Sequence, residues 1–253
     1  MRGGGAVVVG LFLGPGAPFF CARAILQSMS EQPADFSIKR IDAFACSARL
    51  TGAALLLYHR VVVEGGHNLP RAGPGLLLPK HHAYRDIMVE GVLLHRLTKR
   101  YATYVMKRGL WGVLELCGGI KVFRPKDIRR IADREERRAE IRRARAANQR
   151  LQDYLDGLYR HGELVISHPE GMRYQDAMGP LQKEVVEHLV LAQERLGVQV
   201  PLIPIGIEYG SYSRPRAPVY FRVDEPFYAD SFADVGAVMA HLDQRLRTLS
   251  GLA

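Results

Sequence analysis

The sequence predicts an α/β protein, built as a twisted mixed sheet flanked by helices with a helical appendage in front. The main observation is that short apolar runs alternate with stretches of helical periodicity after residue 59. The second is the length of 253 residues, which is enough to bury one substantial core. We therefore divide the chain into an appendage at residues 1–58 and a single main domain at residues 59–253.

The strands are expected where apolar residues form short runs bounded by proline, glycine or charged residues. Four runs fit this description: Gly75–Pro79, Gly118–Arg124, Glu163–Ser167 and Val200–Ile207. The first ends in proline, and a helical run begins soon after it at Asp86. A long surface helix is expected from Lys126 to a stop near His161, because arginines and acids interleave there around a sparse apolar seam.

The segment Lys80–Asp86 contains the most informative spacing in the chain, a histidine five positions before an aspartate. Side chains on a helix meet when they are three or four residues apart, so this spacing does not fit a regular helix. His81 and Asp86 can pair only if the histidine lies on a loop and the aspartate reaches back from the first helical turn. A neutral imidazole held in this way can act as a general base toward an alcohol.

Three alternatives remain open for these residues. His82 and Asp86 are four apart and would pair if the helix began earlier. His81, His82 and Asp86 could together bind zinc, although neither a CxxC nor an HxxxH pattern accompanies them. The third alternative is a polar loop without a chemical role, because so short a pattern is common by chance.

A second group of polar residues follows the expected strand Glu163–Ser167. Pro169 restricts the backbone there, and Gly171 permits a sharp turn or the close approach of a ligand. Glu170 and Arg173 are thereby presented at the carboxyl end of a strand, where α/β proteins bind ligands. Taken alone, the segment is equally consistent with an ordinary turn.

In their order along the chain, these blocks resemble the four motifs of the glycerolipid acyltransferase superfamily. The first motif, a histidine and an aspartate separated by four residues, is matched by His81 and Asp86. The second, glycine and aliphatic residues ending in arginine, is matched by Gly118–Arg124. The third, usually Phe-Pro-Glu-Gly-Thr-Arg, is matched by Pro169, Glu170, Gly171 and Arg173, and the fourth, a Val-Pro-rich hydrophobic strand, by Val200–Pro204.

The chain resembles the bacterial 1-acylglycerol-3-phosphate acyltransferase type within this superfamily, and the resemblance implies the reaction of that type. A fatty acyl group would move from a thioester of coenzyme A or acyl carrier protein to the free hydroxyl of the lysophospholipid, giving phosphatidic acid. His81 would deprotonate the hydroxyl while Asp86 holds the ring. Neither an acyl-enzyme, nor a metal, nor a bound cofactor is implied.

The resemblance also implies which residues bind the acceptor. Arg124 is expected to bind its phosphate, with Arg173 and Lys107 as helpers, because arginine offers a fork of donors that suits phosphate oxygens. Glu170 would either bind an acceptor hydroxyl or brace the arginines. Gly171 would let the acceptor approach the backbone.

The chain departs from the family pattern at four positions. The replacements are Lys80 for the common asparagine, His168 for the aromatic residue, Met172 for threonine and Tyr174 for serine. These changes leave the reacting groups intact but alter the lining of the site. They bear on the identity of the acceptor more than on the reaction.

Composition restricts the partners. The net charge of +9 and the pI of about 9.6 indicate a phosphate-rich partner. Because no RNA-binding signature or aromatic-basic interleaving is present, an anionic membrane surface is favoured over nucleic acid. Cys21, Cys46 and Cys117 are scattered and odd in number, which fits a reducing compartment better than a disulfide framework.

The N-terminal region is apolar but poorly suited to crossing a membrane. Ala6–Phe20 is broken by Gly14–Gly16 and is shorter than the ~20 residues of a spanning helix, while Ile41–Tyr58 carries charges. We expect an amphipathic appendage in the interface, at the cytoplasmic face of the cell membrane, with a core-packed helix pair as the alternative. The arginines of the long surface helix are either simply solvated or bind phospholipid headgroups or an acidic acyl carrier protein.

Rival functions remain at this point. Another member of the superfamily would acylate glycerol-3-phosphate or a different lysophospholipid, and the motifs do not separate these acceptors. A non-catalytic, basic membrane-surface protein is a rival of another class. A metal-dependent hydrolase using His81, His82 and Asp86 is a third.

Overall fold

The computed structural model describes residues 38, 46, 50, 52–54, 56–107, 118–123, 128 and 130–252. The chain divides into two compact units, Met1–Ser37 and Ile38–Ala253, and the described residues belong to the second. Most of the predicted appendage at residues 1–58 lies outside the described residues, so its boundary and its membrane role stay predictions. No described helix combines the length and the apolar character needed to cross a bilayer.

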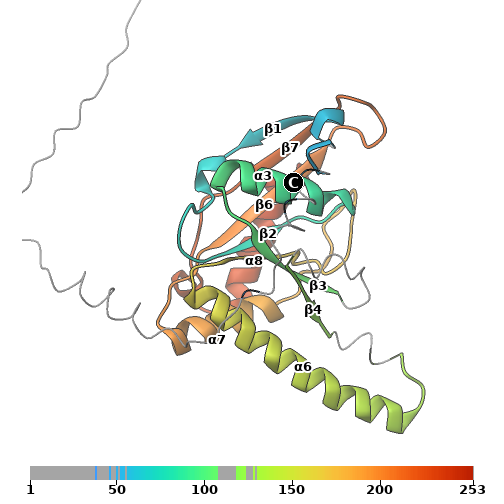
Figure 1. The fold of residues 1–253 in the computed structure, drawn as a ribbon, viewed down its shortest axis with the longest axis vertical. Helices are drawn as coiled ribbons and strands as arrows, with labels where there is room; N and C mark the ends of the chain where they lie inside the picture. Colours follow the sequence, from blue (N-terminus) through green and yellow to red (C-terminus); the bar gives the residue numbers. More distant parts are fainter. Residues whose placement is uncertain are drawn as a thin grey trace, which may run out of the picture. The chain divides into compact units, whose positions relative to one another are not determined.

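A seven-stranded mixed sheet forms the centre of the second unit, with the strand order β1-β7-β6-β2-β5-β3-β4 (Figure 1). The strands are β1 (Arg60–Glu64), β2 (Gly75–Pro79), β3 (Ala102–Lys107), β4 (Gly119–Val122), β5 (Leu164–Ser167), β6 (Leu202–Tyr209) and β7 (Pro218–Val223). Within this sheet β6 and β7 are antiparallel, and the other neighbouring strands are parallel. The prediction of a mixed α/β fold is therefore confirmed.

Five neighbouring strands, β6, β2, β5, β3 and β4, run in the same direction, so their carboxyl ends meet at one edge of the sheet. β2 lies between β6 and β5, where Leu77 pairs with Ile166 of β5 and Ile203 of β6. All five residues of β2 are buried. Such a strand is covered on both faces, which explains its uninterrupted apolar sequence.

The longer helices flank the sheet: α3 (Arg85–Thr98), α6 (Arg134–Arg160), α7 (Glu184–Leu196) and α8 (Val235–Leu249), with short 3₁₀ turns at Gly66–Asn68 and Ala229–Ser231. α3 lies in front of the strands in Figure 1 and packs Val89, Val92 and Leu93 into the core that includes Leu77 and Ile166. These three residues recur at helical spacing, so one stripe of α3 faces the sheet. The packing fixes α3, and with it the first turn that carries Asp86.

α8 approaches the sheet closely at Gly206 of β6. A side-chain carbon added at this glycine would collide with the carbonyl oxygen of Leu249, the last residue of α8. The glycine therefore serves the close contact between helix and strand rather than a turn. This contact lies on the strand that also carries Tyr209 toward the site.

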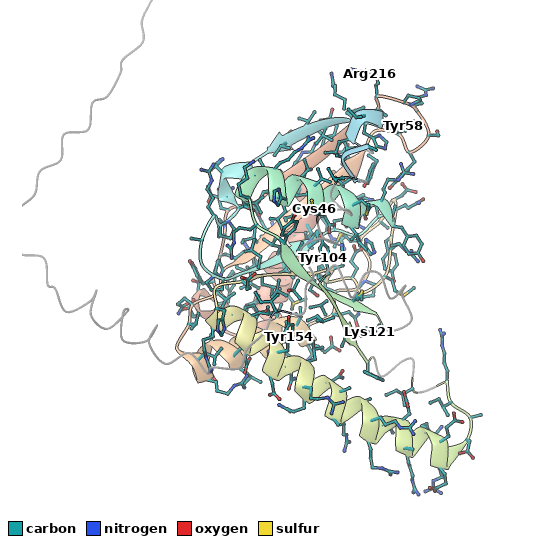
Figure 2. The ribbon with its side chains drawn as sticks, in the orientation of Figure 1. Cys46, Tyr58, Tyr104, Lys121, Tyr154 and Arg216 are labelled. Atoms are coloured by element: carbon teal, nitrogen blue, oxygen red, sulfur yellow. The ribbon has the colours of Figure 1, made fainter. Side chains whose placement is uncertain are left out.

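α6 begins later than the sequence predicts, at Arg134 instead of Lys126. Asp133 is extended there, and its carboxylate accepts a hydrogen bond from the Glu136 backbone N–H. This N-cap fixes the start of the helix. The buried side chains of α6 are concentrated in its second half, including Tyr154 and Leu158, whereas the arginine-rich first half extends away from the sheet (Figures 1 and 2).

Candidate active site

The candidate site lies at the edge of the sheet where β2 and β5 end. β2 leads into the loop that carries His81, and β5 leads into the loop that carries Glu170 and Arg173. A backbone hydrogen bond joins the two loops, since the Tyr174 N–H donates to the His81 carbonyl oxygen at 3.0 Å. Two motifs about 90 residues apart in the sequence are thereby brought together.

His81 and Asp86 lie as their spacing predicts, with the histidine on the loop and the aspartate in the first turn of α3. His81 Nδ1 is 3.0 Å from Asp86 Oδ2. Because a carboxylate only accepts hydrogen bonds, Nδ1 carries the proton, and Nε2 of the neutral ring keeps its lone pair. The His81 side chain is 14% exposed while that of Asp86 is fully buried. The base is therefore accessible and its partner is not.

Both oxygens of Asp86 are held by further donors. Oδ2 also accepts from the backbone N–H groups of His82 at 2.6 Å and Ala83 at 2.7 Å, and Oδ1 accepts from the Tyr209 hydroxyl at 2.8 Å. Burial by itself would raise the pKa of Asp86, but the hydrogen bonds from His81, Ala83 and Tyr209 lower it below its ordinary value. The carboxylate is therefore ionised at neutral pH and fixed in one orientation.

The electrostatic environment of His81 suits a general base. Burial lowers the pKa of its imidazole below the ordinary value, and the hydrogen bond to Asp86 opposes this only in part. A histidine with a lowered pKa is neutral at pH 7, so its Nε2 can accept a proton. Asp86 then stabilises the imidazolium that forms.

His82 is placed differently from His81. Its ring Nδ1 is 2.8 Å from the Gln175 carbonyl oxygen, and only its backbone N–H contacts Asp86. The ring is therefore directed toward the loop after β5, which it helps to hold in place. No described residues form a cluster of three or more histidine, cysteine, aspartate or glutamate side chains suited to a metal ion.

The Glu170 carboxylate is buried and is surrounded by hydrogen-bond donors. Its Oε1 accepts from Lys80 Nζ at 3.0 Å and from the Gly179 N–H at 2.7 Å, and its Oε2 accepts from the His81 N–H at 3.0 Å. Lys80 Nζ also donates to the Tyr174 carbonyl oxygen at 2.6 Å. Both side chains of the Lys80–Glu170 ion pair are fully buried.

This geometry bears on the two roles that the resemblance gives to Glu170. A carboxylate enclosed by three donors has little capacity left for an acceptor hydroxyl. The arrangement favours the bracing role, with Lys80 in the place of the expected arginines. Through the His81 N–H, Glu170 braces the backbone of the base itself.

Arg173 and Gly171 lie on the exposed part of the same loop. Gly171 has a φ of 61°, a left-handed conformation that favours glycine. The Arg173 guanidinium carbon lies 3.6 Å from the centroid of the Tyr84 ring, which belongs to the loop of the His81–Asp86 pair. A cationic group is thus held beside the pair, where a phosphorylated ligand could reach it.

Arg124 lies outside the described residues, as does the side chain of Lys107. Lys107 is placed only by the backbone of its strand. Lys107 is the last residue of β3 and pairs with Val122 of β4. β4 runs parallel to β3, so its last residue, Val122, lies at the same edge of the sheet that holds His81. Their contribution to the site stays a prediction.

Several residues around the site were not predicted. Tyr209 binds Asp86 from the end of β6, and Glu90 lies 3.0 Å from His168 Nε2. Lys80 was noted only as a departure from a family motif. A weak signal existed for Glu90, because a carboxylate four residues after Asp86 falls on the same face of a helix. No such signal existed for Tyr209, which is 123 residues from its partner.

Comparisons with known proteins concern the family and the fold of the chain. The acyltransferase family model matches residues 60–208, which is more than half of the chain. A solved structure with a similar fold is the 1-acyl-sn-glycerophosphate (LPA) acyltransferase PlsC from Thermotoga maritima, at a TM-score of 0.53 and 16% identity. The similarity covers 91% of this chain and 86% of PlsC. No curated protein sequence matches the chain.

Proposed function

The chain belongs to the acyltransferase family, and we propose that it acylates the free hydroxyl of 1-acylglycerol-3-phosphate to give phosphatidic acid. The observation that carries the proposal is the His81–Asp86 pair, in which the base is accessible and its carboxylate is buried and fixed. The fold shared with an acyltransferase whose acceptor is 1-acyl-sn-glycerophosphate supports the same acceptor class. The acyl donor is a thioester of coenzyme A or acyl carrier protein.

The reaction needs one proton acceptor and no covalent intermediate on the protein. His81 Nε2 takes the proton of the acceptor hydroxyl, whose oxygen attacks the thioester carbonyl carbon. The tetrahedral intermediate then collapses, the carbon–sulfur bond breaks, and the thiolate leaves with the proton that His81 returns. Asp86 stabilises the imidazolium between the two proton transfers. General-base assistance of this kind is worth ~100- to 10,000-fold.

The acceptor phosphate requires cations close to the base. Arg173 is held at the site by Tyr84, and we assign the phosphate to it together with Arg124 and Lys107. Anchoring the phosphate would place the hydroxyl against His81, which is how binding energy is converted into turnover. No metal or bound cofactor takes part in these steps.

The substrate would be taken from an anionic membrane surface on the cytoplasmic side. The net charge of +9 supports such a partner. Four arginines of α6, Arg134, Arg138, Arg142 and Arg145, are exposed and follow the spacing of one helix face. We call these four residues the arginine stripe and propose that it contacts the lipid headgroups.

The proposed function is tested with purified protein, lysophosphatidic acid and an acyl thioester, by measuring phosphatidic acid formed with and without a chelator. We expect transfer that survives chelation and is lost in His81→Ala. Glycerol-3-phosphate and other lysophospholipids, assayed in parallel, identify the acceptor. Activity that disappears on chelation would favour a metal-dependent enzyme, and inactivity toward every acceptor would favour a non-catalytic membrane-surface protein.

A further inference from the structure

A second histidine–carboxylate pair lies against the first. His168 Nε2 is 3.0 Å from Glu90 Oε1, and the rings of His168 and His81 are in contact, with centroids 4.0 Å apart and planes inclined by 32°. Because the Glu90 carboxylate can only accept, His168 Nε2 carries a proton. The two imidazoles thus contact each other, and each is held by its own acid.

One helix supplies both acids. Asp86 and Glu90 are four residues apart on α3, so they project from the same face and meet the two rings side by side. His168 directly follows β5, at the position where the family usually has an aromatic residue. An aromatic ring there could pack against His81 as well as an imidazole does. Unlike a phenyl ring, an imidazole can also carry a positive charge. The buried acid Glu90 then has a charged partner.

The surroundings of Glu90 require a positive neighbour. Glu90 is 2% exposed, and its Oε2 has no hydrogen-bond partner among the described residues. The nearby hydroxyl of Tyr104 donates to the Ile87 carbonyl oxygen instead (Figure 2 shows Tyr104 on β3). Burial, and then the negative charge of Glu90, raise the pKa of Tyr104 well above its ordinary value, so the tyrosine stays neutral. An ionised Glu90 is therefore compensated chiefly by His168.

The charges that face His168 come from three elements. α3 contributes Glu90 and Asp86, the loop after β2 contributes His81, and the loop of His168 itself contributes Glu170. Burial would lower the pKa of His168, but the three carboxylates, Glu90 foremost, raise it above its ordinary value. Conversely, His168 is one of the groups that lower the pKa of His81. The two rings in contact are thus driven toward opposite charge states.

We propose that His168, paired with Glu90, acts as a charged positioning residue that keeps His81 neutral and so sets the pH range in which His81 can take the acceptor's proton. This inference rests on the proposed acyl transfer at the same site. It also gives the second half of the reaction a driving force. Once His81 is protonated, two imidazolium rings face each other, and repulsion favours return of the proton to the departing thiolate.

The test replaces His168 by phenylalanine, alone and together with Glu90→Gln. Phenylalanine keeps a ring against His81, and the double variant avoids an unpaired buried carboxylate that could impair folding. The titration of His81 is followed by NMR of ¹³C-labelled histidine without substrate, with His81→Ala identifying its signal. We expect the His81 midpoint to rise by ~0.5 pH unit or more in His168→Phe, since a neighbouring cation is removed, and to rise by less in the double variant, which also removes the negative charge of Glu90.

Kinetics provide the second measurement. The acid limb of the kcat/KM profile should move to higher pH by the same amount, with most of the plateau activity retained. His188→Phe is the matched control, because His188 is also buried against a carboxylate, Asp156, but on α7 and α6. It should leave the His81 titration unchanged.

Unchanged His81 midpoints in both His168 variants would overturn the inference, as would equal shifts in His188→Phe. The NMR measurement needs no turnover. A shifted midpoint in a protein that transfers no acyl group would therefore reject the proposed function and leave the charge coupling standing. An unshifted midpoint in an enzyme that transfers acyl groups would reject the charge coupling and leave the proposed function standing.

Discussion

Asp86 is the residue on which the geometry of the site depends. It orients His81, accepts hydrogen bonds from two backbone N–H groups of the preceding loop, and accepts another from the Tyr209 hydroxyl on a distant strand. A single carboxylate thus holds the base, the loop and the end of β6 together. Substitutions near it should therefore be judged by which of these contacts they remove.

The two adjacent histidines give the sharpest test at this scale. His81→Ala should lower turnover by ~100- to 10,000-fold without unfolding the protein, because it removes the proton acceptor. His82→Ala should keep substantial activity, since the His82 ring contacts the Gln175 carbonyl oxygen rather than Asp86. Steady-state kinetics and thermal unfolding of both variants show which histidine is the proton acceptor. An inactive His82 variant beside an active His81 variant would contradict the assignment.

The arginines assigned to the acceptor should affect binding more than chemistry. Arg173→Ala or Arg124→Ala removes charge-assisted hydrogen bonds to phosphate, so the KM for the phosphorylated acceptor should rise roughly 10- to 100-fold. The KM for the acyl thioester should change much less. Lysine at either position should restore only part of the loss, because it lacks the planar fork. A collapse of thioester affinity with unchanged acceptor dependence would assign the residue to the donor.

The buried Lys80–Glu170 pair predicts a specific pattern of stability. Lys80→Met should lower the free energy of unfolding by ~3–5 kcal/mol, because it leaves Glu170 charged and unpaired in the interior. Adding Glu170→Gln should recover part of that loss, since no charge is then left uncompensated. Urea unfolding of the two single variants and the double variant measures the coupling. Simple additivity would show that the two groups do not depend on each other.

At this scale the sequence predicted what is local. The five-residue spacing of His81 and Asp86 implied a loop and a first helical turn, and the structure has both. Tyr209 and the His168–Glu90 contact could not be predicted in this way, because they join residues 123 and 78 positions apart. Such contacts arise only when the strands have assembled.

Among the elements, α6 combines two functions along its length. Its second half buries Tyr154, Leu155 and Leu158, and its first half carries the arginine stripe. Arg134 is the first residue of α6 and opposes the helix dipole, so its place in the stripe is not explained by helix stability. The acids Glu135 and Glu136 in the first turn offset this cost.

The stripe should contribute to membrane binding. Arg142→Gln together with Arg145→Gln should weaken binding to vesicles containing phosphatidylserine by roughly 30-fold, since each arginine near an anionic surface contributes ~1 kcal/mol, or about fivefold. The matched control is Arg143→Gln with Arg150→Gln, which removes the same charge from the other side of the helix. Co-sedimentation at low salt measures both. Equal losses would show that net charge, not the stripe, binds the lipid.

The strands were predicted unevenly. β2 has the predicted limits, and β4, β5 and β6 lie within two residues of theirs, because buried runs are distinct in sequence. β1, β3 and β7 were not predicted. β1 is a short edge strand that is largely exposed, and the alternating burial of β7 becomes clear only beside β6. Whether a half-buried segment forms a strand depends on the strands that it packs against.

For the whole molecule, attachment to the membrane should have an apolar and an electrostatic part. Deleting residues 1–34 removes no motif residue and should weaken membrane association. High salt should release part of the remaining protein, because it screens charges over ~8–10 Å at moderate ionic strength but leaves apolar insertion intact. Flotation of both forms with liposomes measures this. A full-length protein that stays entirely in the soluble fraction would favour core packing of the segment.

The pairing of β1 with β7 has a consequence for synthesis of the chain. Arg60 aligns with Pro218, so β1 has no strand partner among the described residues until 158 further residues have been made. At ~5–20 residues per second, this delay on the ribosome lasts roughly 8–30 s. During that time Val61–Val63 offer an unpaired apolar edge to other nascent chains. Chaperone demand should therefore fall once β7 has emerged from the exit tunnel.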